Sequence, residues 1–485
     1  MISRANPSLS LYLENAAFGL LLAVVALSPL PFGSNGSESM PFLSAVSGLV
    51  LILTTLSLVT RLEPLETPRA RWLITASACF AGFALWALVQ LVPDLPAGLS
   101  HPIWAEAKSV LSIAAISATI SIDPLATLAA LAKTGGYFAI ALSAIILLRD
   151  SGRRRAAAWI LIVAGGLYAA YGLIGLETGD CCVVWQKKIA YQGVATGPFI
   201  NRNSFATYLG LILIVCLGQV LREFGALGHI SAPGWVRRSM ARLGLLIARQ
   251  WLTIAAFTAT ISALLLTQSR AGITSTLLAC GALVLLLSLA RVLSEKRRPV
   301  ANFAVFAGIA GLSLMLFGSA WINRVADEGV EDAYRTQSWK IMITAIEASP
   351  WLGHGFGTFP EAFPLYRDDR LPSRRYWDKA QDTYIELAMD MGIPATVVLL
   401  LGFGALAAQC VKGLSRRRKE RRLYPALGLA AMVLVGAHSI FDFSMQIPAI
   451  ATTFAFIIGI AITESGIWRT REPDQPSATR SRYRP

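Results

Sequence analysis

Charged residues are scarce in this chain. Asp, Glu, Lys and Arg make up 15% of its 485 residues, hydrophobic residues make up 55%, and the mean hydropathy is +0.56. Soluble globular proteins carry about 25% charged residues. The scarcity of charge therefore excludes an ordinary soluble protein and predicts an all-α polytopic membrane protein.

Histidine and cysteine are also few. The four histidines stand at positions 101, 229, 354 and 438, and their spacing matches none of the zinc motifs. Four of the six cysteines lie in apolar runs, where a thiol packs as a small hydrophobe. Cys181 and Cys182 are adjacent and would form only a strained disulfide. We expect no metal and no cofactor.

Nucleotides and nucleic acids are not indicated as partners. The glycines at 353, 355 and 357 are not followed by the Lys-Ser or Lys-Thr of a phosphate-binding P-loop, and they fit a tight, close-approach loop instead. The net charge of +14 comes from Lys and Arg in short clusters between apolar runs. Such clusters act as membrane topology signals.

Long apolar runs fill most of the chain. A helix needs roughly 20 apolar residues to cross a bilayer, and we count about twelve such runs. They cover residues 16–31, 41–60, 72–93, 125–148, 156–176, 204–221, 250–267, 272–290, 299–320, 391–411, 423–442 and 448–466. Residues 109–121 are a candidate interfacial helix.

The basic residues indicate how the chain is oriented. Counted from a cytoplasmic N-terminus, every second loop is rich in Lys and Arg, as the positive-inside rule requires. The alternation predicts an even number of spans, both termini in the cytoplasm, and one large outer loop. We divide the chain into N-terminal transmembrane helices (1–194), transmembrane helices with outer-face arginine motifs (195–320), the large loop (321–390), C-terminal transmembrane helices (391–466) and a disordered tail (467–485).

Two arginines stand where apolar runs begin. Arg202 lies between Asn201 and Asn203, and its fork of donors suits phosphate oxygens. A snorkelling interfacial residue is the alternative interpretation. Arg270 lies in a very short turn, Thr267-Gln-Ser-Arg-Ala-Gly272, which places a cation close to the membrane. Ionisable groups at such depth are functional or paired.

The large loop holds a third arginine. Arg335 lies one turn before Trp339 on a helix that we expect to run to Ser349. The loop also has four clustered arginines, at 367, 370, 374 and 375. These fit a solvated surface at least as well as a binding site.

Three acidic residues recur at intervals of four near the end of the loop. A helix would align Asp382, Glu386 and Asp390 on one face. A carboxylate placed there could act as a general base. Acidic residues also stabilise the first turn of a helix, which is the structural alternative for Asp382.

Six motifs together resemble the O-antigen ligase and O-antigen polymerase superfamily. They are Gly197-Pro-Phe-Ile-Asn-Arg-Asn-Ser-Phe-Ala206, Thr267-Gln-Ser-Arg-Ala-Gly272, Arg335-x-x-x-Trp339, Pro350-Trp-Leu-Gly-His-Gly-Phe-Gly-Thr-Phe359, Asp382-x-Tyr384-x-Glu386 and His438-Ser-Ile-Phe-Asp442-Phe-Ser-Met-Gln446-Ile-Pro448. The motifs run in order from about residue 195 to 450. The first 190 residues share only a general membrane character.

This resemblance implies a multi-pass glycosyltransferase of the bacterial inner membrane, with a GT-C-like architecture and periplasmic chemistry. Such enzymes take a glycan from undecaprenyl pyrophosphate and join it to another lipid-linked glycan, to lipid A core or to a protein. The implied product is a surface polysaccharide such as O-antigen or exopolysaccharide. The expected partners are this donor, a glycan or lipid A core acceptor, and membrane lipids. By analogy Arg202, Arg270 and Arg335 bind the pyrophosphate, which requires no metal.

One motif departs from the family. Relatives carry His-Asn-x-Tyr-Leu-Glu where this chain has Gln381-Asp-Thr-Tyr-Ile-Glu386. Ligases are thought to engage the acceptor hydroxyl with that histidine, and a glutamine cannot take a proton. Either Asp382, Glu386 or His354 substitutes for it beside Gln381, or the chain uses a different acceptor or is inactive. The departure favours a polymerase over a ligase.

The last motif adds His438 and Asp442, on either side of the final outer turn. A helical i, i+4 pairing would let Asp442 orient the imidazole, and a structural hydrogen bond between span ends is the alternative. Together with Asn201, Asn203 and Tyr384, these two residues complete the expected substrate-binding set.

A transporter or flippase is the competing class of function, because about twelve spans with basic inner loops fit it as well. Transport sites place ionisable groups or broken helices near the membrane midplane. The predicted spans contain almost no internal charge, and no two halves of the chain echo each other. We therefore favour the transferase.

Overall fold

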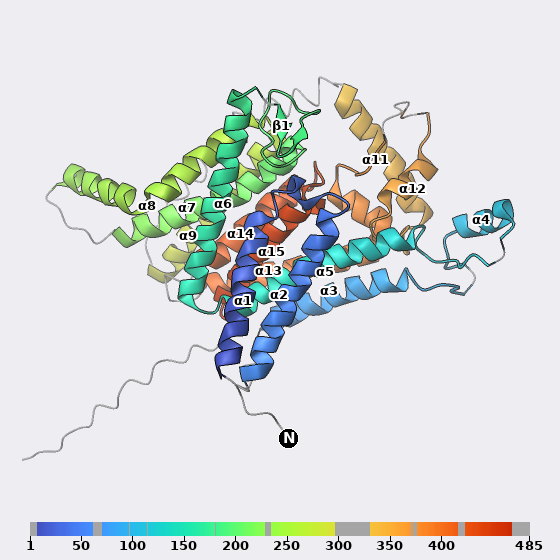
Figure 1. Ribbon diagram of the computed structural model, residues 1–485, viewed down its shortest axis with the longest axis horizontal. Coiled ribbons are helices and arrows are strands. Elements are labelled where there is room, and N and C mark those ends of the chain that lie inside the picture. The colour runs from blue at the N-terminus through green and yellow to red at the C-terminus, as the bar shows by residue number, and fades with distance from the viewer. Residues whose placement is uncertain are drawn as a thin grey trace, which may run out of the picture.

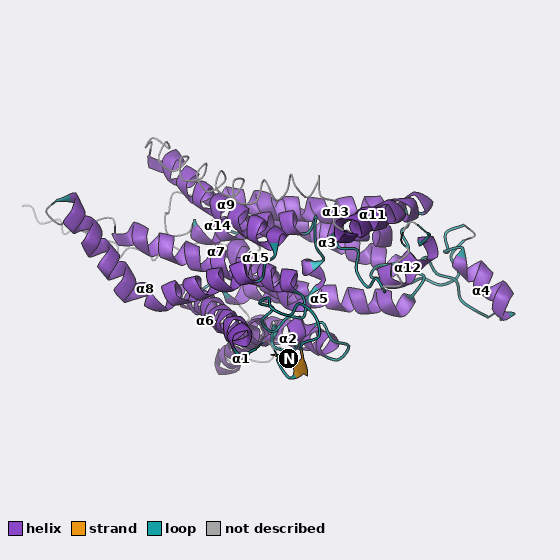
Figure 2. Cartoon of the chain, turned by 90° about the horizontal axis from the view of Figure 1, so that it is seen from above, coloured by secondary structure: helices purple, strands orange, loops and turns teal. Residues whose placement is uncertain are grey.

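The chain folds into a bundle of long helices. The computed structural model describes residues 7–61, 70–96, 98–113, 115–179, 181–227, 234–295, 330–369, 371, 376–415 and 422–467. Within these residues the only strands form a small antiparallel hairpin, β1 (Cys182–Val183) and β2 (Gln186–Lys187). Figures 1 and 2 show the helices lying side by side, with α11, α12 and α4 gathered at one side.

The predicted membrane spans correspond closely to these helices. Eleven of the twelve predicted runs overlap a helix, and the run 299–320 lies outside the described residues. The helices are α1 (Pro7–Leu27), α2 (Ser39–Arg61), α3 (Arg71–Val89), α5 (Pro124–Leu147), α6 (Ser151–Glu177), α7 (Arg202–Ala226), α8 (Trp235–Leu266), α9 (Arg270–Glu295), α13 (Thr383–Leu414), α14 (Leu423–His438) and α15 (Pro448–Glu464). In the described part of the chain, nine are long and apolar enough to cross a membrane, and α14 and α15 are shorter. The all-α polytopic membrane architecture is confirmed.

Shorter elements lie between the spans. They are the 3-10 helices η1 (Phe32–Ser34) and η4 (Ser444–Gln446) and the α-helices α4 (Ile103–Leu111), α11 (Val330–Ala348) and α12 (Phe359–Tyr366). The helix predicted to end at Ser349 is confirmed as α11. The interfacial helix predicted at 109–121 is wrong, because Ser112 takes a left-handed conformation that ends α4, and irregular backbone follows.

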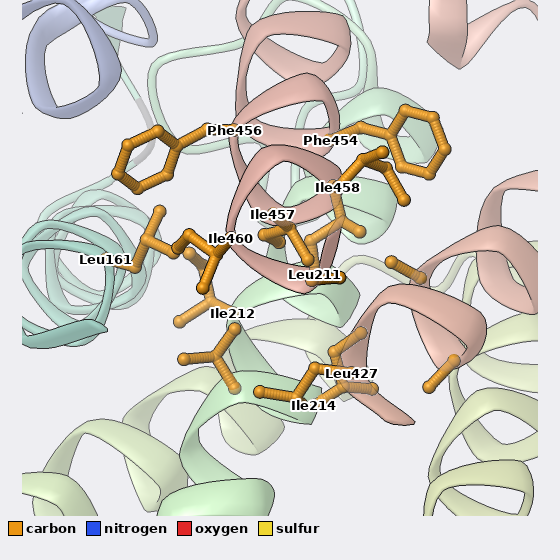
Figure 3. Packing of buried hydrophobic residues seen from close by; sticks show 14 of the residues in the cluster. Leu161, Leu211, Ile212, Ile214, Leu427, Phe454, Phe456, Ile457, Ile458 and Ile460 are labelled. Carbon is orange, nitrogen blue, oxygen red and sulfur yellow. The ribbon is translucent and has the colours of Figure 1, made fainter. Parts of the chain in front are cut away.

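The core lies where α7, α14 and α15 meet. Figure 3 shows apolar side chains of α15 facing α7, α14 and α6; the labelled residues are Leu161, Leu211, Ile212, Ile214, Leu427, Phe454, Phe456, Ile457, Ile458 and Ile460. Small residues also allow α15 to pack closely against α5, because a Cβ added at Gly459 of α15 would lie 2.5 Å from the Cβ of Ala144 of α5. This packing fixes the helix ends that carry the candidate site.

One end of the bundle is where α7, α9, α13 and α15 begin, and we call it the Arg202 end. Ion pairs tie the helices together at the opposite end. Glu14 of α1 pairs with Arg61 and Arg153, and Arg154 pairs with the buried Glu464 at 2.7 Å. These ion pairs connect α1, α2, α6 and α15, so the arginines at this end of the bundle are paired with acidic residues of neighbouring helices.

The predicted spans remain nearly free of charge, and Lys133 of α5 is the charged residue inside the run 125–148. Helix α13 begins at Thr383, eight residues before the predicted run, and its backbone leaves helical geometry at Gly392 (φ 77°, ψ 161°), so Glu386 and Asp390 lie in the part of the helix before this break. Lys133 of α5 interacts electrostatically with both of them. At 1.5 Å per residue the two acids stay within about 12 Å of the start of α13, so they belong to the Arg202 end.

Candidate functional site

Arg202 is the first residue of α7. Asn201 caps this helix, because its side-chain oxygen accepts hydrogen bonds from the backbone amides of Asn203 (2.7 Å) and Ser204 (3.4 Å). The half-buried Arg202 guanidinium lies 5.6 Å from the centroid of the Tyr191 ring. A helix start attracts anions through its free amides and dipole, and Arg202 adds a full positive charge there.

Arg270 is likewise the first residue of α9. Ser269 caps that helix, and its hydroxyl accepts a hydrogen bond from the Gly272 amide at 3.2 Å. The Arg270 side chain is exposed. Gly272 lets α9 approach α7, since an added Cβ would lie 2.4 Å from the Cβ of Ala206. The two helices that begin with arginine therefore start side by side.

A buried polar network connects these two helix starts. Asn203 accepts a hydrogen bond from the Ser269 hydroxyl (2.8 Å) and donates one to the Asp442 carboxylate (2.7 Å). The other oxygen of Asp442 accepts from Ser444 (2.8 Å). Buried polar groups with satisfied partners hold a structure rigidly. Asn203 and Asp442 thus position the arginines, and direct contact with substrate stays a prediction for both.

The start of α13 joins the same network. Thr383 donates from its amide to the Ser439 carbonyl (2.9 Å) and from its hydroxyl to the Asp442 carbonyl (3.0 Å). Tyr384 donates its hydroxyl to the Gly436 carbonyl at 2.9 Å. The elements that carry three of the predicted motifs therefore meet at one turn, between α14 and α15.

Arg335 reaches this end of α13 from α11. Its Nε and Nη2 donate to the side-chain oxygen of Gln381, at 3.3 and 3.1 Å. Gln381 takes a left-handed backbone conformation with φ of 56° just before the helix. The third predicted arginine is thus held next to Asp382.

Asp382 caps α13. Its Oδ1 accepts hydrogen bonds from the amides of Tyr384 (2.9 Å) and Ile385 (3.0 Å), so the structural alternative predicted for it is found. The residue is buried, and burial raises the pKa of its carboxyl group above the ordinary value of 3.8. A raised pKa also suits a general base, so the capping role does not exclude the catalytic one.

Glu386 and Asp390 follow Asp382 on the same face of α13, as predicted. Glu386 accepts a hydrogen bond from the Ala380 amide (2.7 Å), and Asp390 accepts one from the Gly357 amide (2.8 Å). Both side chains are buried. They bind the loops on either side of α12 to the membrane helix.

His438 is buried at the end of α14. Its Nδ1 lies 3.1 Å from the Thr207 hydroxyl of α7. Helix α14 stops at His438, so the residues up to Asp442 do not continue the helical spacing. Of the two predicted arrangements, the hydrogen bond between span ends is the one observed.

Comparison with protein families relates this geometry to known proteins. Residues 255–400 match the O-antigen ligase family. The match confirms the predicted resemblance to the O-antigen ligase and polymerase superfamily, and it supports glycan transfer of this general type. It spans Arg270, Arg335 and Asp382, while Arg202 and Asp442 lie outside it. Comparison with curated proteins found no match.

His354 lies within the O-antigen ligase match and is one of the residues that we expected as a base. His354 is fully buried, its Nδ1 lies 3.0 Å from the Met389 carbonyl, and its Nε2 lies 2.8 Å from the Tyr366 hydroxyl. Only a donating Nδ1 can bond to a carbonyl, so Nε2 accepts from Tyr366. Burial lowers the pKa of this imidazole from its ordinary value of 6.5. Both ring nitrogens are thus engaged by the protein.

The glycine-rich segment of the O-antigen ligase match is a close-approach loop, as predicted. Gly353 (φ 71°) and Gly355 (φ 118°) have left-handed conformations that favour glycine. An added Cβ at Gly353 would lie 2.3 Å from the Asp390 carbonyl oxygen. The loop therefore rests directly on the backbone of α13.

Sequence reasoning missed two residues of this region. Gln90, at the end of α3, donates to the carbonyls of Leu352 (2.9 Å) and Asp390 (3.0 Å) and accepts from the Phe356 amide (3.0 Å). Lys133 lies near Glu386 and Asp390. Neither residue belongs to a sequence motif. Lys133 could have been singled out because it is a lone lysine inside the apolar run 125–148, and charged residues inside spans are often functional. Gln90 gave no such signal.

Of the four clustered loop arginines, Arg367 lies in the described part of the chain. Arg367 donates to the Leu371 carbonyl at 3.2 Å. Arg370, Arg374 and Arg375 lie outside the described residues.

Proposed function

We propose that the protein transfers a glycan from undecaprenyl pyrophosphate to a lipid-linked acceptor, on the periplasmic face of the bacterial inner membrane. Both termini would lie in the cytoplasm, as the distribution of basic residues indicates. The observation that carries the proposal is that α7 and α9 each begin with an arginine and are joined by the Asn203–Ser269 hydrogen bond. Two helix starts and two guanidinium groups suit a pyrophosphate.

Arg335 supplies a third positive charge from the large loop. In the proposed reaction the bond between the donor's anomeric carbon and its pyrophosphate oxygen breaks, and the acceptor hydroxyl oxygen bonds to that carbon. Negative charge then grows on the departing pyrophosphate, where the three arginines stabilise it. Asn201, Asn203, Tyr384, His438 and Asp442 hold the helix ends and complete the proposed binding site.

Asp382 is the group that we propose takes the acceptor's proton. One of its oxygens is fixed by two backbone amides, its pKa is raised, and its neighbour Gln381 contacts Arg335. Glu386 lies one turn deeper and is the alternative base. His354 is engaged through both nitrogens, and the amide of Gln381 is not basic, so neither is favoured as the base.

The substitution Asp382→Asn distinguishes the proposed role of Asp382 as a base from its role as a helix cap. Asparagine caps a helix as well as aspartate does, but it cannot take a proton. We expect the variant to fold normally and to lose transfer by about a hundredfold or more.

We expect Gln381→Ala to lose less transfer activity than Asp382→Ala. Rates are measured with purified protein and lipid-linked glycan, after matching protein amounts.

The same assay tests the assignment of the base. Wild-type transfer by Asp382→Asn would show that the residue is only a cap, and Glu386→Gln would then be examined in the same way. A greater loss in Gln381→Ala than in Asp382→Ala would also remove Asp382 as the base.

The rate of transfer should depend on pH. The base must be ionised, so kcat/KM falls as the pH drops through the pKa of Asp382. Because burial raises that pKa above 3.8, the fall should occur at a higher pH than for an exposed aspartate. A pH–rate profile that is flat from neutral pH down to about 4 would contradict this assignment.

The polymerase is the form of the reaction that we favour, because Gln381 replaces the family histidine. The test is the glycan profile of a deletion strain, with surface polysaccharide and lipid-linked intermediates analysed side by side. A polymerase predicts that long chains vanish while single repeats still reach their acceptor. Long chains that persist on the polyprenyl lipid would identify a ligase.

A further inference from the structure

Helix α8 is longer than a membrane crossing requires, and it is bent. Its 32 residues would extend about 48 Å at 1.5 Å per residue, whereas the hydrocarbon core is about 30 Å thick. The backbone leaves helical geometry at Gln250 (φ −124°, ψ 21°), near the start of the predicted span 250–267. Figures 1 and 2 show α8 projecting from the bundle on the side away from α4 and α12.

The segment before this bend, residues 235–249, has an apolar stripe. Val236, Met240, Leu243 and Ile247 recur at i, i+4, i+7 and i+11, which places them on one face of a helix. All four are exposed, from 48% for Leu243 to 64% for Met240. In this segment Leu246 is the buried residue among those whose side chains are described. The stripe is therefore not covered by the described part of the protein.

The opposite face of the segment is basic. Arg238, Arg242 and Arg249 recur at i, i+4 and i+11, about half a turn away from the apolar stripe, and Leu245, which is 40% exposed, lies on the same face as these arginines. Arg237 adds a fourth positive charge, and the sequence from 235 to 249 contains no acidic residue. Arg249 lies 3.1 Å from Glu223 of α7. A helix with one apolar and one basic face is typical of a membrane surface.

We propose that residues 235–249 lie flat on the membrane, with the apolar stripe among the acyl chains and the arginines on the phosphates of anionic lipids. Two observations identify lipid as the occupant. The segment continues directly into a membrane span, so the stripe emerges at the level where that span leaves the hydrocarbon. The segment also carries four arginines and no acidic residue of its own, so it stays positively charged although Arg249 pairs with Glu223 of α7, and this charge complements an anionic surface. This inference does not depend on the proposed glycan transfer.

The depth of the helix tests the proposal. Spin labels are placed at Met240→Cys and Ala241→Cys, one residue apart but about 100° apart around the helix. Cys79, Cys181 and Cys182 are first changed to serine because they are not buried. The full-length protein is placed in bilayer discs that contain phosphatidylglycerol. We expect the label at 240 to meet oxygen and avoid a water-soluble nickel reagent, and the label at 241 to meet the nickel reagent.

Two results of this experiment would overturn the proposal. Labels that are equally accessible to nickel would show that the segment stands in water. A label at 240 that is shielded from both reagents would show that protein, and not lipid, covers the stripe.

Removing arginine charges from the segment tests whether it binds anionic lipid headgroups. The purified protein is equilibrated with mixed phosphatidylcholine and phosphatidylglycerol vesicles, and the retained phosphatidylglycerol is counted by native mass spectrometry. We expect the double variant Arg238→Gln, Arg242→Gln to lose retention by about fivefold for each charge removed. The double variant Arg238→Lys, Arg242→Lys keeps the charge and should retain the lipid. Arg155→Gln, an exposed arginine on α6, is the control.

Equal retention in the glutamine variant and the control would reject anionic lipid as the ligand. If the lysine variant lost as much lipid as the glutamine variant, the effect would come from packing, and the proposal would also fail.

Discussion

Arg202→Ala and Arg270→Ala are each expected to lower glycan transfer by about a hundredfold or more, at unchanged abundance in the membrane. Each arginine stands at the start of a helix, and the two helices begin side by side. In the reaction that we propose, negative charge develops there as the pyrophosphate leaves. Removal of one group that stabilises such charge costs about 10²- to 10³-fold in rate. Neither side chain is part of the buried core, so the fold should survive both substitutions. Transfer is measured in vitro, and abundance by immunoblot of isolated membranes.

Arg155→Ala is a matched control for these variants. It removes an exposed arginine at the opposite end of the bundle, so it changes the net charge equally and leaves the proposed site intact. Normal transfer by Arg202→Ala and Arg270→Ala would disprove the pyrophosphate-binding role of the two arginines. Arg202→Lys and Arg270→Lys are expected to recover part of the rate, because lysine keeps the charge but loses the fork of donors.

Gly353→Ala is expected to destabilise the protein more than any other substitution considered so far. A Cβ at Gly353 would lie 2.3 Å from the Asp390 carbonyl oxygen and 2.6 Å from the Gly392 amide nitrogen. Both obstacles are backbone atoms, so no side chain can turn aside. The positive φ of 71° adds conformational strain. We expect a loss of about 3 kcal/mol or more in the free energy of unfolding.

Gly404→Ala is the matched control for this prediction. Gly404 lies in α13, the helix on which the glycine loop rests, and an added Cβ there meets no atom within 4 Å. Alanine in a helix interior is about 1 kcal/mol more favourable than glycine, so this variant should be as stable as the wild type or more so. Thermal unfolding in detergent compares the two variants. Equal unfolding temperatures would show that the loop does not depend on the close approach at Gly353.

The sequence was sufficient to predict most of the helices, because hydrophobic runs of spanning length depend on composition alone. It misplaced the short helix near residue 109, where the left-handed conformation of Ser112 ends α4. Serine adopts this conformation without the signal that glycine gives. It placed the start of the last large run at residue 391, next to the break at Gly392, and it did not predict the two helical turns of α13 before that break, because their acidic residues resemble a loop in a hydropathy profile.

The arginines of the candidate site could be predicted because each stands in a short local pattern. Asn201 before Arg202 and Ser269 before Arg270 are residues that cap helices. The connections between these patterns could not be predicted. Asn203 contacts residues 66 and 239 positions away, and such pairs are fixed only by the packing of whole helices.

Gln90 shows the same limit at the glycine loop. Its three hydrogen bonds reach residues more than 260 positions away. A glutamine at the end of an apolar run can make many different hydrogen bonds, and no residue near it in the sequence indicates these partners.

The contact between Gln381 and Arg335 constrains how this site can evolve. Gln381 has a single side-chain oxygen, which accepts two donors of Arg335. A neutral histidine offers only one acceptor nitrogen, and a protonated one offers none and repels the guanidinium. A substitution of Gln381 by histidine would therefore remove at least one of these two hydrogen bonds. We therefore expect substitutions at positions 335 and 381 to have coupled, non-additive effects.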